Sequence, residues 1–334
     1  MNKGRDNLPA VLGIGNALVD IMTSIENDTI LEEFGLPRGS MTLVDAGKSE
    51  EIYEATLVRQ ESVTTGGSAA NTIHALAGLG GNCGYLGKIG KDKLGNIFKE
   101  EFEKRSINTH LSLSGKGTGR VMALVSRDSE RTMATFLGAA VDLDAADLDE
   151  TVFIDYEYLY IEGYLVQNHE LIETAIKMAK SKGLKIAIDL SSYNVVEENL
   201  GFLKMLIKDY VDIVFANEEE ALAFTGQQPE AALKALSGQC GLAIVKIGKK
   251  GSLIKEGGKE IKIGSVKAQA IDTTGAGDSY AAGFLYGLTN NLSLEQCGKI
   301  AALVSGKVVE VMGAKLPENV WGELNWQIKN LCTH

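Results

Sequence analysis

The segment 272–287 carries residues that could transfer a charged group, and it reads DTTGAGDSYAAGFLYG. Gly275, Ala276 and Gly277 predict a turn, and Asp278 falls in the first turn of the helix that follows. The first N–H groups of a helix have no partner within it, and this end carries about half a positive charge, so the turn can bind a phosphoryl group. An ionised Asp278 beside it could accept the proton of an attacking hydroxyl.

A second segment, 64–90, has side chains suited to sugar hydroxyls. A predicted strand ends at Gly66 and Gly67, and Ser68 and Asn71 open a helix of small residues. The hydroxyl and the amide can bind sugar hydroxyls, and the glycines let a ligand approach the backbone. Each segment also has a purely structural interpretation, in which Asp278 and Ser68 cap helices and Asn71 bonds to the backbone.

Composition limits the ligand class. The chain has 334 residues, with 44 Asp and Glu against 33 Lys and Arg, and it has no basic run. Nucleic acid and anionic membranes are therefore disfavoured as partners, and an anionic ligand must be held by local groups. The four cysteines are scattered, which disfavours zinc sites and disulfides. With no signal sequence or apolar run long enough to cross a bilayer, a cytoplasmic protein is expected.

The elements that must position these residues alternate between strands and helices. Short apolar runs predict buried strands at 10–14, 157–161, 185–190, 211–215 and 242–247. Amphipathic stretches between them predict helices, and this alternation is typical of a doubly wound parallel sheet in a three-layer α/β/α fold. Shorter alternating runs predict a small antiparallel sheet that acts as a lid. We expect a large domain from 1–15, 46–105 and 138–334, and a lid from 16–45 and 106–137.

Two other glycine motifs are incomplete. After the first predicted strand, Leu18 stands where a dinucleotide fingerprint needs its third small residue, which disfavours an NAD-dependent oxidoreductase. Gly47, Lys48 and Ser49 match the end of a phosphate-binding loop, but Thr42 replaces its first glycine. That stretch is interpreted as the first turn of a helix.

Several ordered segments together resemble the ribokinase/PfkB family of sugar and nucleoside kinases. They are the opening 13–20, the two segments described above, 216–220 with the turn 247–251, and the late pair 313–314. The resemblance extends over nearly the whole chain and is greatest to the adenosine kinase branch, through the spacing of Asn16 and Asp20 and through 130–140. It implies an ATP-dependent kinase that phosphorylates the 5′-hydroxyl of a ribonucleoside such as adenosine.

Site residues follow from this resemblance position by position. It implies a general base at Asp278, an anion hole from Gly275 to Gly277 and a phosphoryl clamp at Arg131. The substrate would contact Asn16, Asp20, Gly67, Ser68, Asn71 and Phe136. The nucleotide would lie against Asn217, Glu220, Lys246, Gly248, Gly251 and Gly313. Mg²⁺ would be held through water by Asn217 and Glu220, and some relatives suggest K⁺ near Asp272 and Thr274.

The sequence leaves alternatives open. Many relatives have threonine at the position of Lys246, so this lysine either contacts the phosphates or points to solvent. A sugar kinase acting on ribose, fructose or 2-keto-3-deoxygluconate is the first rival, with Arg120 as a cation for a keto acid. A non-catalytic nucleoside sensor is the second. A monomer and a homodimer both fit the apolar lid residues.

Overall fold

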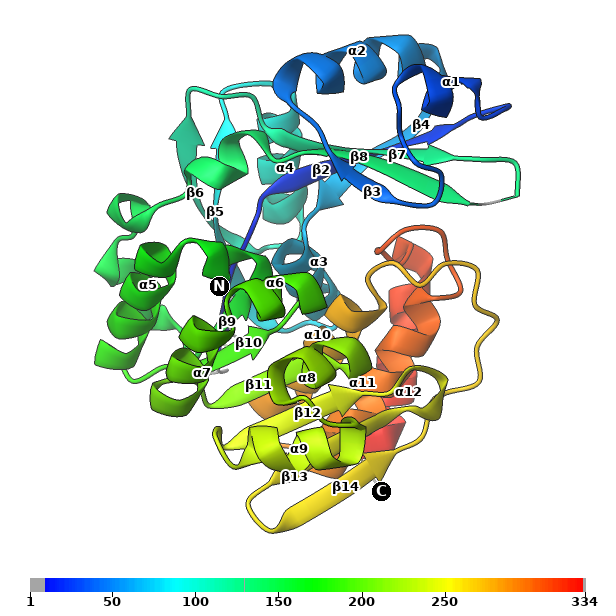
Figure 1. The fold of residues 1–334 in the computed structure, drawn as a ribbon. Helices are drawn as coiled ribbons and strands as arrows, with labels where there is room; N and C mark the ends of the chain where they lie inside the picture. The colour runs from blue at the N-terminus through cyan, green and yellow to red at the C-terminus, as the bar shows by residue number, and fades with distance from the viewer. Residues whose placement is uncertain (1–9, 129, 333–334) are drawn as a thin grey trace, which may run out of the picture.

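A nine-stranded sheet forms the centre of the computed structural model, which describes residues 10–128 and 130–332 (Figure 1). Its strand order is β14-β13-β12-β11-β10-β9-β1-β5-β6. The strands are parallel from β6 to β12, and β13 and β14 add antiparallel at one edge. Their bounds are β1 (Ala10–Ile14), β5 (Asn82–Gly90), β6 (Asn108–Ser114), β9 (Tyr158–Glu162), β10 (Lys185–Asp189), β11 (Ile213–Asn217), β12 (Leu242–Lys246), β13 (Ser252–Glu256) and β14 (Lys259–Ile263).

Helices cover both faces of this sheet. One face packs on α3 (Ser68–Gly78), α4 (Lys93–Lys104), α10 (Ala276–Thr289), α11 (Leu294–Val308) and α12 (Glu318–Cys332). The other packs on α5 (His169–Ser181), α6 (Tyr193–Glu198), α7 (Leu200–Asp209), α8 (Glu218–Thr225) and α9 (Pro229–Ser237). Two separate apolar cores result, one on each side of the sheet. This confirms the three-layer fold, which the continuous apolar strands predicted.

A second, five-stranded sheet lies beside the first, with order β3-β8-β7-β2-β4 (Figure 1). Its strands are β2 (Leu18–Ser24), β3 (Met41–Leu43), β4 (Gln60–Gly66), β7 (Gly119–Val125) and β8 (Arg131–Phe136). The helices α1 (Thr29–Glu33) and α2 (Ala46–Thr56) accompany it. On one face Ile21, Met122, Leu124 and Ala134 are completely buried, because they share a core with residues of these helices.

The expected composition of the small sheet was wrong in three respects. Residues 108–114 form β6 and pair with β5 in the large sheet, although we expected 106–137 wholly in the small one. Residues 60–66 form β4 and pair with β2 in the small sheet, although we expected them in the large domain. The small sheet is also mixed, because β2 pairs in parallel with β7, and β3 with β8. Residues 1–9 of the expected large domain lie outside the described residues.

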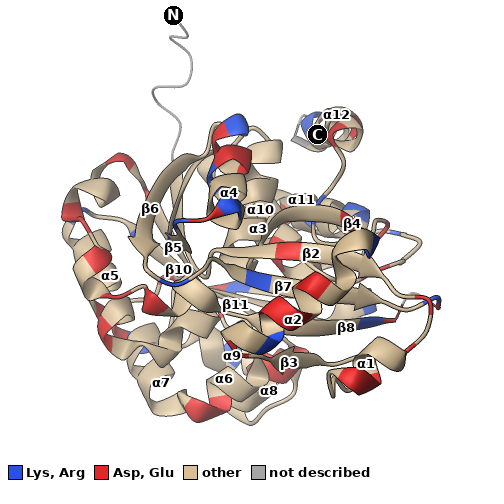
Figure 2. Cartoon of the chain, turned by 90° about the horizontal axis from the view of Figure 1, so that it is seen from above, with Lys and Arg blue, Asp and Glu red and all other residues tan. Residues whose placement is uncertain are grey.

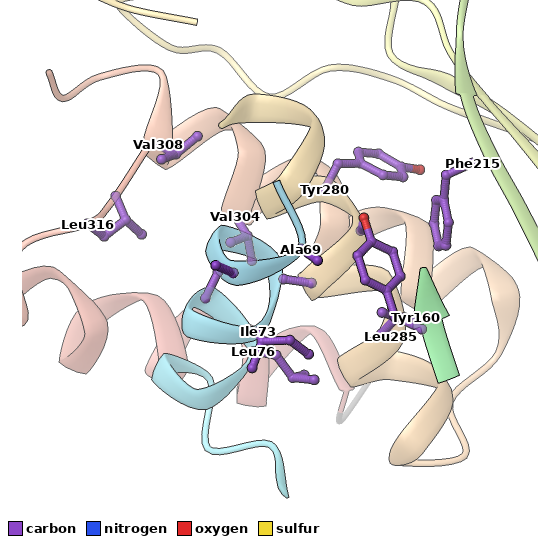
Figure 3. Close-up of a cluster of buried hydrophobic side chains, with 14 of the residues drawn as sticks. Ala69, Ile73, Leu76, Tyr160, Phe215, Tyr280, Leu285, Val304, Val308 and Leu316 are labelled. Carbon is purple, nitrogen blue, oxygen red and sulfur yellow. The ribbon is translucent and has the colours of Figure 1, made fainter. Parts of the chain in front are cut away.

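A buried apolar cluster fixes α3 against α10 (Figure 3). Ala69, Ile73 and Leu76 of α3 pack with Leu285 of α10 and Val304 of α11. Tyr160 on β9 adds its hydroxyl, which accepts a hydrogen bond from Thr72 Oγ1 at 3.3 Å. Because the first turns of α3 and α10 start from this shared core, the side chains at those turns have fixed relative positions.

Charged residues of both signs are scattered along the chain (Figure 2). The formal net charge of the whole sequence is −11. Across residues 10–128 and 130–332, no helix has the length and apolar content that spanning a bilayer requires.

Candidate active site

Asp278 lies in the first turn of α10, as predicted. The turn before it needs glycine, since Gly275 has φ of +72° and an added Cβ would lie 2.5 Å from the Cβ of Ala314. Among the described residues, no side chain caps this helix. The Ala276 N–H, which was expected to bind the anion, instead donates to the Thr273 carbonyl oxygen at 3.2 Å. The N–H groups of Gly275 and Gly277 have no side-chain acceptor in the described chain, as an anion-binding turn requires.

Ser68 and Asn71 converge on Asp278 from α3. The Ser68 hydroxyl donates to Asp278 Oδ1 at 2.7 Å, and Asn71 Nδ2 donates to Oδ2 at 3.1 Å. The cap of α3 is Gly67, with no side-chain bond, so Ser68 is not a capping residue. In the described part of the chain, the buried Asn71 Oδ1 has no hydrogen-bond partner. The two glycine segments, about 200 residues apart, thus form one site with a free acceptor.

The surroundings of Asp278 tune its acidity. Burial raises the pKa of Asp278 to about 6, against the opposing hydrogen bonds from Ser68 and Asn71. The nearby Asp189 raises this pKa further, and Lys246 lowers it. The carboxylate is therefore ionised at neutral pH and is a stronger base than a free aspartate.

Arg131 reaches the same turn from β8 of the small sheet. Its Nη1 lies 2.7 Å from Asp272 Oδ2 and donates to Thr274 Oγ1 at 3.0 Å. Its Nε and Nη2 are buried and have no hydrogen-bond partner within the described residues. Buried donors without acceptors are costly, so these two N–H groups fit an anionic ligand at this place.

Asp20 and Asn16 lie against the two glycines that precede Ser68. Asp20 is on β2, and a Cβ added to Gly66 would lie 2.1 Å from its Oδ1. Asn16 donates from Nδ2 to Glu162 Oε1 at 2.6 Å. Gly67 has φ of +102°, and a Cβ there would lie 2.1 Å from the Asn16 carbonyl oxygen. This close backbone approach explains the second glycine of the segment.

Polar residues also gather at the ends of β10, β11 and β12. Asn217 and Glu220 form a capping box at the start of α8. Lys246 Nζ lies 2.8 Å from Asp189 Oδ2 and would lie 3.2 Å from a Cβ added to Gly277. Lys246 therefore points toward the anion-binding turn and not into solvent. Gly248 and Gly251 flank the short turn between β12 and β13.

The family model for pfkB carbohydrate kinases matches residues 39–320. The chain belongs to this family. A probable sugar kinase from Rhizobium etli has a solved structure that is 34% identical, with a TM-score of 0.86 and coverage of 97% of this chain and 99% of that one. The adenosine kinase of Sinorhizobium meliloti is 35% identical, with a TM-score of 0.84 and coverage of 97% and 99%. Adenosine kinase 2 of Arabidopsis thaliana is 24% identical over 92% of this chain and 96% of its own length.

This pfkB kinase is a phosphotransferase, and its family accounts for the use of ATP.

One expected substrate residue, Phe136, is not brought to the site. Side chains alternate along β8, so Phe136 lies on the face opposite to Arg131 and beside its cross-strand partner Arg120. Arg120 in turn donates to Ser49 Oγ at 2.7 Å and to Glu50 Oε2 at 2.6 Å, on α2.

Sequence reasoning missed two buried carboxylates beside the pfkB site, Glu162 and Asp189. Glu162 ends β9 and accepts the backbone N–H of Ala69 at 2.9 Å, besides the amide of Asn16. Burial raises the pKa of Glu162 to about 7. Asp189 ends β10 and holds Lys246. An acid at the end of a buried apolar strand was the signal in both cases, because parallel strands end at the same edge of their sheet.

Two cations implied by the family differ in their fit. Glu220 is buried, and burial and Asp189 raise its pKa to about 7. Each of its carboxylate oxygens accepts one hydrogen bond from Asn217, which leaves a lone pair on each oxygen for a water bound to Mg²⁺. Asp272 is less suitable for K⁺. Its Oδ1 accepts two bonds from Thr274, and its Oδ2 accepts the Gly313 N–H at 2.7 Å and contacts Arg131. The side chain of Asp272 is thus fully engaged, so K⁺ would need the backbone carbonyls near Asp272 and Thr274 through which relatives bind it, and we assign no step to it.

Proposed function

We propose that this pfkB kinase transfers the γ-phosphoryl group of ATP to the 5′-hydroxyl of a ribonucleoside, with adenosine as the preferred substrate. The observation that carries the reaction type is the convergence of Ser68, Asn71 and Asp278 beside the uncapped start of α10. A hydroxyl placed there lies between a base and an anion-binding turn. These two groups are what phosphoryl transfer to an alcohol requires.

In the proposed mechanism the 5′-oxygen attacks the γ-phosphorus, the bond to the leaving ADP breaks, and Asp278 accepts the hydroxyl proton. The N–H groups of Gly275 and Gly277 face the charge that develops on the phosphoryl oxygens, whereas the Ala276 N–H donates to the Thr273 carbonyl oxygen at 3.2 Å. Arg131 offers Nε and Nη2, which have no partner among the described residues, from β8 of the small sheet. Asp20 and Asn71 hold the ribose hydroxyls, because a carboxylate and a free amide oxygen both accept hydrogen bonds.

Mg²⁺, when bound, would neutralise phosphate charge, and Asn217 and Glu220 are the residues that would hold it through water. Lys246, fixed by Asp189, adds a positive charge next to Gly277. Positioning and charge account for most of the rate in such reactions, so exclusion of water by the small sheet matters as much as the base.

The uncovered face of the small sheet supports a nucleoside over a bare sugar. The strand register places Met22, Val121 and Met133 on the same face as Asp20, with Met41 and Leu43 on the adjacent β3. These side chains are partly or largely exposed, whereas the opposite face is buried under helices. An apolar face beside a hydroxyl-binding carboxylate suits a substrate with a flat, largely apolar base on its ribose.

The rival functions predict different sites. A keto-acid sugar kinase would need Arg120 free at the substrate, yet Ser49 and Glu50 hold it on the far face. Ribose and fructose carry no base, so they would leave the uncovered apolar face of the small sheet without a partner. A non-catalytic sensor would not require Asp278, an anion-binding turn and the buried Arg131 to lie together in one site.

A substrate panel tests the proposal. ADP release is measured with adenosine, inosine, guanosine, ribose, fructose and 2-keto-3-deoxygluconate, each with MgATP. We expect the highest kcat/KM with adenosine and lower values for all three sugars. A higher kcat/KM with any of the sugars would overturn the nucleoside assignment. Absence of turnover with every compound would favour the sensor.

The pH dependence of kcat/KM gives a second test. Asp278 must be ionised to accept a proton, and the pKa values of Asp278 and Asp20 are both raised to about 6 by burial. Activity should therefore be complete well above pH 6 and fall as pH drops through about 6, more steeply than for one titrating group. An acid limb with its midpoint near 4, the range of an unperturbed aspartate, would contradict both assignments.

A further inference from the structure

Two buried hydroxyl groups close to the anion-binding turn take no part in the proposed mechanism. The oxygens of Tyr280 on α10 and Ser252 on β13 lie 2.6 Å apart, and either hydroxyl can donate. Tyr280, which belongs to the apolar cluster of Figure 3, is 5% exposed, and Ser252 is completely buried. In the described part of the chain, neither hydroxyl has another hydrogen-bond partner. Because buried polar groups need a partner, this one bond joins the start of α10 to β13.

Tyr280 shares a face of α10 with Gly277, because residues three apart on a helix lie on the same side. Gly277 belongs to the anion-binding turn, and a Cβ added to it would lie 3.2 Å from Lys246 Nζ. Asp278, the next residue, faces α3 instead, where it accepts the hydroxyl of Ser68. The face of α10 that carries Gly277 and Tyr280 is thus turned toward β12 and β13.

Lys246 and Ser252 form the matching pair on the sheet. They lie directly opposite each other where β12 pairs antiparallel with β13, so their side chains leave the same face. The next pair on that face, Ile244 and Ile254, packs in the core that contains α10, which identifies the face. The ammonium group of Lys246 is also fixed from β10, because it lies 2.8 Å from Asp189 Oδ2.

Two contacts therefore lie side by side between α10 and these two strands. Tyr280 meets Ser252 in one, and Gly277 approaches Lys246 in the other. Since a hydrogen bond weakens steeply when its partners move apart or out of line, the first contact restricts movement in the second. A phosphoryl group at the turn would have to meet the N–H donors and the ammonium group together. A displacement of about 1 Å in such a site can cost about 10²-fold in rate.

We propose that Tyr280 and Ser252 are positioning residues for phosphoryl transfer, because their hydrogen bond sets the spacing between Gly277 and Lys246. The proposal rests on the assignment of the turn and of Lys246 to the phosphoryl group in the proposed function. Both residues are buried, so they act through the turn and the lysine. The spacing is set before ATP binds, and the donors need not reorganise as charge develops.

The variants Tyr280→Phe and Ser252→Ala test this role, because each removes one hydroxyl and leaves the other unpaired. We expect each to lower kcat roughly tenfold, a smaller loss than a full 1 Å displacement can cause, and to change KM for ATP far less. The kcat is measured with the panel substrate that has the highest kcat/KM, so the result does not depend on the nucleoside assignment.

Tyr156→Phe is the matched control for these variants. Tyr156 is also buried, and its hydroxyl lies 2.9 Å from His110 Nε2. It precedes β9, whereas the site lies where β9 ends, so it belongs to the opposite edge of the sheet. Its loss of one bonded hydroxyl should leave kcat unaltered. A wild-type kcat in both Tyr280→Phe and Ser252→Ala would overturn the proposal.

The double variant Tyr280→Phe/Ser252→Ala separates positioning from stability. Loss of both hydroxyls leaves no unpaired polar group, so the midpoint of thermal unfolding should return toward the wild-type value. The kcat should stay as low as in the single variants, because the bond that sets the spacing is still absent. A kcat that recovered together with the midpoint would assign the pair to stability alone and refute its positioning role.

Lys246→Met as a background shows through which group the pair acts. In this background Tyr280→Phe should lower kcat far less than in the wild type, because the spacing to an absent ammonium group has no effect. An equal fold-loss of kcat in both backgrounds would contradict the proposal. A Lys246→Met protein with the wild-type kcat would instead refute the assignment of Lys246 to the phosphoryl group, the part of the proposed function on which the pair depends.

Discussion

Replacing Asp278 with asparagine is expected to lower kcat by at least about a hundredfold, because removal of a general base costs roughly 10² to 10⁴ in rate. The asparagine has nearly the same shape and can still accept the Ser68 hydroxyl, which bonds to Asp278 Oδ1 at 2.7 Å. Substrate and ATP affinities should therefore stay near those of the wild type. Steady-state kinetics together with calorimetric titration of ATP measures both quantities.

The control for this variant is Asp209→Asn, at the exposed end of α7. It makes the same chemical change far from the site and should leave kcat unaltered. An Asp278→Asn protein that kept half of the wild-type activity would remove Asp278 from the role of base. A loss of ATP binding equal to the loss of kcat would assign Asp278 to nucleotide binding instead.

Arg131→Ala should lower kcat by roughly 10² to 10³, the cost of removing a preorganised donor to developing charge. KM for either substrate should change far less. The reason lies in the geometry: Nη1 is held by Asp272 at 2.7 Å, while Nε and Nη2 are buried without partners in the described chain. Donors that gain their acceptor as charge develops stabilise the transition state more than the ground state.

The kcat of Arg131→Lys should lie between those of the wild type and of Arg131→Ala, because a lysine keeps the charge but lacks the fork of a guanidinium. Arg38→Ala is the control, since Arg38 also belongs to the small-sheet region, where it pairs at the surface with Asp28 and Asp128. An Arg131→Ala protein with a raised KM and an unchanged kcat would make Arg131 a plain binding residue.

The sequence predicts the large sheet and the core of the site well. Apolar runs mark β1, β9, β10, β11 and β12 because both faces of each strand are buried, which leaves an unmistakable local pattern. The turn at Gly275 and the position of Asp278 in the next helix follow from local chemistry too. The confirmed family resemblance depends on the same local motifs.

What the sequence misses is determined by pairing over long distances. Strands β4 and β6 have short alternating patterns that fit either sheet, and only their partners β2 and β5 decide which one they join. Phe136 was assigned by position in a motif, yet the register of β8 directs it away from the site. Tyr280 and Ser252 are 28 residues apart, and nothing in the local sequence of either one indicates their hydrogen bond.

The most direct test of nucleoside 5′-phosphorylation is identification of the product. Wild-type protein is incubated with MgATP and adenosine, and the phosphorylated product is identified by ³¹P NMR, with 5′-deoxyadenosine as the matched substrate that lacks the attacking hydroxyl. We predict stoichiometric formation of ADP and adenosine 5′-monophosphate, and no transfer to 5′-deoxyadenosine. Phosphate on the 2′- or 3′-oxygen, or ADP release without a phosphorylated nucleoside, would contradict the proposed function.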